Sequence, residues 1–75
     1  MELTKKDKLI FLMGKMRQVN ISKEDIIGML SMLKTEEMID EMIYYLVNNP
    51  DLTEEKVVKA LIIVVREAEE NKATK

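Results

Sequence analysis

Four carboxylates near the middle of the chain come closest to a chemical site: Glu36, Glu37, Asp40 and Glu41. Residues three and four positions apart share a face of a helix, so this group has the spacing of a divalent-cation site or of a paired-carboxylate acid and base. The chain contains no histidine or cysteine, and the group lies opposite the apolar stripe of its helix. We therefore interpret it as a solvated acidic face at the positive end of the helix dipole, and expect no bound metal. The same interpretation applies to the later carboxylates, Glu67, Glu69 and Glu70.

Nucleophilic catalysis has no candidate group. An activated serine, threonine or cysteine needs a neighbouring base, and there is no histidine to supply one. Four hydroxyl residues are better explained as helix N-caps, and Ser31 falls inside a predicted helix without a partner. The sequence therefore predicts no catalytic residue, no cofactor and no enzymatic activity.

Composition indicates one small globular domain. The chain has 75 residues, of which 47% are apolar and 35% are charged. Its longest apolar run, residues 60–65, is far shorter than the ~20 residues of a membrane span. The first residues lack the apolar segment of a signal peptide, so we expect a cytoplasmic protein without membrane contact. We predict a single helical domain over 1–75, with frayed ends at about 1–3 and 72–75.

Helix starts can be predicted from capping residues, whose side-chain oxygens accept from the free N–H groups of the first turn. The candidates are Thr4, Ser22, Thr35 and Thr53. Asp25 follows Ser22 at the spacing of a capping-box acid, and residues 48–51 (Asn-Asn-Pro-Asp) interrupt any helix. These signals predict helices over 4–18, 22–33, 35–48 and 53–71.

Each predicted helix carries an apolar stripe at three- and four-residue spacing, which predicts one shared core. The stripes are Leu9, Leu12, Met13 and Met16; Ile26, Met29, Leu30 and Leu33; Ile39, Met42, Ile43 and Leu46; Val57, Leu61, Val64 and Val65. The fourth helix differs because residues 57–65 place apolar groups in nearly every direction. We therefore expect an all-α fold, a compact four-helix domain with short loops, whose fourth helix is central and lies at a homodimer interface.

Apolar residues outside the four stripes suggest where a partner binds. Hydrophobic burial and chain entropy nearly cancel in so short a chain, so association would add useful stability. The candidate interface comprises Ile10, Phe11, Gly14, Met32, Tyr44, Val58, Ile62 and Ile63. We expect the partners to be a second copy of the chain and an unknown protein. The predicted function is a small, self-associating protein–protein interaction module of the adaptor or inhibitor type.

Methionine and tyrosine positions refine this prediction. The chain contains seven methionines, a residue type that forms adaptable grooves for partner helices. We expect Met13, Met16, Met29 and Met42 to fill the core, and Met32 and Met38 to be the members of such a groove. Of the adjacent tyrosines, we expect Tyr45 to be half buried and Tyr44 to be exposed.

A dimeric helix-turn-helix regulator that binds nucleic acid is the alternative, because two predicted helices are joined by a very short link. The recognition helix would be 35–48, which has four carboxylates and no lysine or arginine. Phosphate contacts would depend on the first helix, through Lys5, Lys6, Lys8, Lys15 and Arg17. An acidic recognition helix repels phosphate, so this alternative is the weaker prediction.

Overall fold

The computed structural model describes the backbone of residues 3–73 and the side chains of residues 3–70. Four α-helices follow one another in this region, with no strand: α1 (Lys5–Gln18), α2 (Lys23–Ser31), α3 (Glu36–Val47) and α4 (Glu54–Ala73). All four predicted helices are therefore confirmed. The main differences are that α2 ends two residues earlier than predicted and that α4 continues through residues 72 and 73. Residues 1, 2, 74 and 75 lie outside the described range.

The four predicted caps begin the four helices. The side-chain oxygens of Thr4, Ser22, Thr35 and Thr53 each accept from the backbone N–H three residues later, at 3.1 to 3.2 Å. The capping box, however, is at the first helix, where the Thr4 N–H also donates to the Asp7 carboxylate at 3.2 Å. At Ser22 only the cap bond forms. The prediction that Asp25 completes a capping box with Ser22 was therefore wrong. The capping box is formed by Thr4 and Asp7 instead.

Local hydrogen bonds also end the helices. Asn20 adopts a left-handed conformation with φ of 65°, and the N–H groups of Asn20 and Ile21 donate to the carbonyls of Arg17 and Met16. This is a Schellman motif, in which asparagine tolerates the conformation that glycine usually supplies. Because the chain turns there, Ile21 points inward and is only 6% exposed.

Two asparagine side chains end α3, donating back to the carbonyls of Tyr44 and Tyr45. Ser31, expected to lack a partner, is instead the last residue of α2, and its hydroxyl donates to the Gly28 carbonyl at 2.7 Å.

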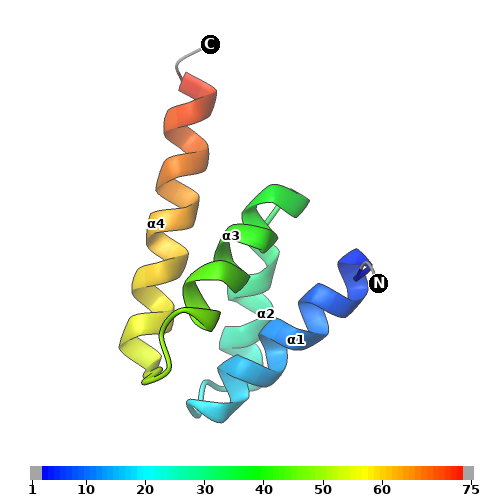
Figure 1. The fold of residues 1–75 in the computed structure, drawn as a ribbon, viewed down its shortest axis with the longest axis vertical. Coiled ribbons are helices and arrows are strands. Elements are labelled where there is room, and N and C mark those ends of the chain that lie inside the picture. The colour runs from blue at the N-terminus through cyan, green and yellow to red at the C-terminus, as the bar shows by residue number, and fades with distance from the viewer. Residues whose placement is uncertain (1–2, 74–75) are drawn as a thin grey trace.

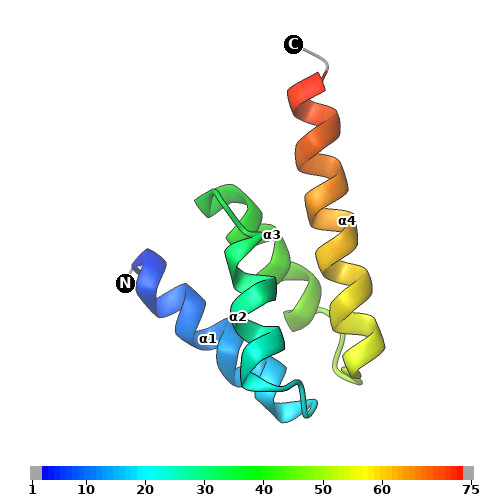
Figure 2. The same ribbon diagram turned by 180° about the vertical axis from the view of Figure 1, so that it is seen from behind.

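The third helix, rather than the fourth, lies between its neighbours (Figures 1 and 2). It packs against α1 on one side and α4 on the other, whereas α4 packs chiefly against α3. α3 and α4 run in opposite directions, closest near the loop that joins them and further apart toward the start of α3 (Figures 1 and 2). The structure thus does not place α4 at the centre.

One core joins all four helices. Its fully buried large side chains are Leu12, Met16, Ile39, Met42, Val57 and Val64. Most predicted stripe residues belong to it or pack against its edge, including Met29, which is partly buried. Met13 is an exception, since 37% of its surface is exposed and the prediction that it fills the core was wrong. Ala60, absent from the predicted stripe, is buried instead.

Candidate protein-binding surface

The residues of the candidate interface are exposed, as the helical spacing predicts. They are Ile10, Phe11, Gly14, Met32, Tyr44, Val58, Ile62 and Ile63. The Tyr44 side chain is 66% exposed, whereas Tyr45 is half buried, so both tyrosine predictions are confirmed. Further exposed apolar side chains, outside the candidate set, are Leu3, Met13, Ile27 and Val47.

These residues do not form one continuous patch. Ile62 and Ile63 are adjacent on α4, so at about 100° per residue they lie on different flanks of the helix. Ile10, Phe11 and Gly14 belong to α1, on the other side of α3 (Figure 1). The candidate residues therefore belong to at least two separate surfaces, one on α1 and one on α4.

The α1 surface is open around its glycine. A Cβ atom placed on Gly14 would meet nothing within 4 Å, so no helix of the same chain uses the space. The Lys15 ammonium lies 5.6 Å from the centroid of the Phe11 ring, in the range of a cation–π contact.

A groove lies where α3 and α4 move apart, and we call it the α3–α4 groove. Its volume is about 680 Å³. It is lined by Met32, Lys34, Thr35, Glu37, Met38, Glu41, Val64, Val65, Ala68 and Glu69. Met32 and Met38, the two methionines predicted to belong to a groove for partner helices, both line it. Met32 also reaches a second, smaller groove between α2 and α4, which includes Val58.

The α3–α4 groove contains residues that the sequence prediction assigned elsewhere. Val65 was placed in the core, and Glu41 and Glu69 were treated as parts of solvated acidic faces. Val65 is partly buried at the edge of the core, and Glu41 is partly buried too. A helical stripe identifies the side of α4 that faces α3, but not where the two helices separate.

Three carboxylates line this groove, Glu37 and Glu41 from α3 and Glu69 from α4. Partial burial, followed by the negative charges of Glu67 and Glu37, raises the pKa of Glu41 above its usual value. The Tyr45 hydroxyl donates to Glu67 at 3.1 Å, and this hydrogen bond is the main cause that raises the pKa of Tyr45. Glu67 is therefore a hydrogen-bond acceptor between α3 and α4, and its interpretation as a purely solvated residue was wrong.

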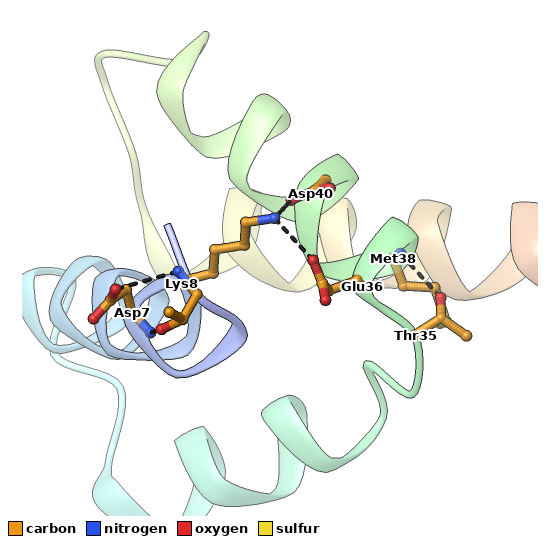
Figure 3. Close-up of polar contacts among 7 residues, drawn as sticks. Asp7, Lys8, Thr35, Glu36, Met38 and Asp40 are labelled. Atoms are coloured by element: carbon orange, nitrogen blue, oxygen red, sulfur yellow. Dashed lines mark hydrogen bonds and ion pairs between the residues drawn. The ribbon is translucent and has the colours of Figure 1, made fainter. Parts of the chain in front are cut away.

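The N-terminal part of α3 is held by a lysine from α1. The Lys8 ammonium lies 2.8 Å from Asp40 and 3.2 Å from Glu36 (Figure 3). These hydrogen bonds, to Asp40 first and then Glu36, raise the pKa of Lys8. Half of the predicted acidic face therefore binds α1, and Lys8 is occupied rather than available to a phosphate.

Among the described side chains, no three aspartates or glutamates are grouped so that they could hold a metal ion. Within residues 3–73, no helix combines the length and the apolar character needed to cross a membrane. Exposed apolar side chains and an apolar groove with an acidic rim are the features that remain to be explained. The chain matches no protein-family model, and neither the curated proteins nor the solved structures compared with it give a match.

Proposed function

We propose that this chain is a small, non-catalytic protein–protein interaction module of the adaptor or inhibitor type, and that it self-associates as a homodimer in the cytoplasm. The observation that supports this proposal is the surface of α4. The helix buries Val57, Leu61 and Val64, yet Ile62 and Ile63 remain 49% and 42% exposed on its two flanks. Exposed apolar residues are common singly, but Val58, which is 40% exposed, lies one turn from Ile62 on the same face of α4, and such a pair favours a protein partner.

A second copy of the chain is a suitable partner for this surface. A two-fold axis beside α4 would bring the same residues of two subunits together. Covering the exposed parts of Val58 and Ile62 contributes roughly 1 kcal/mol each, since full burial of such a side chain contributes about 1.5 to 3 kcal/mol. Association also orders side chains at the interface and removes translational and rotational freedom of the subunits. Both costs oppose this gain, so we expect a weak dimer.

Nucleic acid is a poorer partner for the same structure. The exposed carboxylates of α3 repel phosphate, and Lys8 is already paired with Glu36 and Asp40. No contact in the described region favours the helix-turn-helix alternative, and we do not propose it.

Sedimentation equilibrium over a range of concentrations tests the dimer. We expect the wild-type chain to dimerise in the micromolar range and Ile62→Glu to shift it to monomer, because a carboxylate would be desolvated in the interface. The matched control is Val47→Glu, at an exposed α3 position (59%) outside the candidate set. A wild-type chain that stays monomeric at high micromolar concentration, or equal association by both variants, would contradict the proposed dimer.

A further inference from the structure

The floor of the α3–α4 groove is apolar and adaptable. Its apolar lining residues are Met32, Met38, Val64, Val65 and Ala68. Methionine side chains are unbranched and polarisable, so they fit apolar groups of different shapes. Such a floor suits aliphatic or aromatic side chains of a partner.

The rim of the groove is acidic. Glu37, Glu41 and Glu69 line it, with Lys34 as the single cation among the lining residues. None of the ion pairs among the described side chains uses these three carboxylates. Their charge is therefore available to a cation brought by another molecule.

The backbone around the groove limits the form of that molecule. Seven of the groove's ten lining residues lie on α3 and α4, whose backbone N–H and C=O groups are bonded within the helices, and the other three belong to the α2–α3 link. An extended peptide therefore finds no strand edge to pair with. A helix satisfies its own backbone and can present an apolar stripe to the floor and basic side chains to the rim.

We propose that the α3–α4 groove binds an amphipathic helix of a partner protein that carries lysine or arginine beside its apolar stripe. This inference rests on the proposed function, since it names the kind of partner that the interaction module takes. A second copy of the chain suits this groove less well. Its basic helix α1 lies on the opposite side of α3 from α4 (Figures 1 and 2), so docking of α1 from one copy in the groove of another would join two different surfaces instead of the same α4 surface twice.

Two adjacent glutamates of α4 provide a matched test. Glu69 lines the groove, whereas its exposed neighbour Glu70 does not. The probe is a fluorescent 18-residue amphipathic peptide of leucine and lysine, compared with a peptide in which every lysine is glutamate. Anisotropy titrations measure binding to the wild-type chain, to Glu69→Lys and to Glu70→Lys, with circular dichroism to check that each variant is folded.

We expect the lysine peptide to bind and the glutamate peptide not to bind. Glu69→Lys should weaken binding about tenfold, whereas Glu70→Lys should change it by less than about twofold, because only the first reverses a charge at the rim. Met32→Gln should also weaken binding, although it leaves the net charge unchanged, since it removes part of the apolar floor.

Three results would overturn the inference. Equal weakening by Glu69→Lys and Glu70→Lys would show general attraction between opposite charges. No binding of the lysine peptide up to millimolar concentration would exclude this class of partner. Self-association that Glu69→Lys abolishes, while peptide binding is absent, would identify a second copy as the occupant. The sedimentation behaviour of Ile62→Glu is measured separately, so the dimer proposal can fail while the groove proposal stands, or the reverse.

Discussion

At the scale of single residues, Glu41 is the clearest case of a charge placed unfavourably for folding. Its pKa is raised, so the folded chain binds the proton of this carboxyl more tightly than the unfolded chain does. The stabilisation from that proton is fully present below the unfolded value of about 4.5 and is lost as pH rises through the folded pKa. At neutral pH the ionised carboxylate is partly desolvated and faces the charges of Glu37 and Glu67, with Lys34 as the one cation lining the same groove.

We therefore predict that Glu41→Gln raises stability at pH 7 by roughly 0.5 kcal/mol, and that the gain disappears below pH 4. Urea unfolding at both pH values measures the difference. Glu70→Gln, at an exposed position, is the control and should change stability little at either pH. A Glu41→Gln variant that is less stable than wild type at pH 7 would show that this carboxylate has a favourable partner in solution.

At the scale of the helices, capping is local and could be read directly from residue type. Each cap uses an oxygen and an N–H only three residues apart, so Thr4, Ser22, Thr35 and Thr53 were predictable without knowledge of the fold. Helix ends were less predictable. Ser31 ends α2 through a bond to Gly28, two residues before the apolar pattern stops.

Loss of the cap at Thr53 should weaken α4 at its first turn. We predict that Thr53→Ala lowers the free energy of unfolding by about 1 kcal/mol, because the Lys56 N–H loses its acceptor. Thr53→Ser retains the hydroxyl and should recover most of the loss. Both can be measured by urea denaturation, and equal stability of the two variants would mean that the cap contributes nothing.

At the scale of the whole molecule, the order of packing was the least predictable feature. The apolar character of α4 suggested a central position, yet it is α3 that packs against both α1 and α4. A stripe tells which side of a helix is buried, but the choice of neighbour depends on crossing angles and loops. For the same reason the α3–α4 groove could not be located from the sequence, although its two methionines were predicted to line a groove.

Two methionines that were both predicted to belong to apolar stripes test this packing. Met42 is fully buried in α3, whereas Met13 on α1 is 37% exposed. We predict that Met42→Ala costs about 2 to 5 kcal/mol, a large share of the stability of so small a domain. Met13→Ala should cost less than about 1 kcal/mol, since little packing is lost. Thermal unfolding of both variants makes the comparison, and similar losses would contradict the assignment of Met13 to the surface.

The methionines that line the α3–α4 groove also make its floor sensitive to oxidants. Met32 is 46% exposed, so peroxide can reach its sulfur, while Met16 and Met42 are shielded. Oxidation to the sulfoxide would make this part of the apolar floor polar and chiral, and methionine sulfoxide reductases can reverse the change. Any complex formed through the groove would then respond reversibly to oxidative stress, while the interior stays intact.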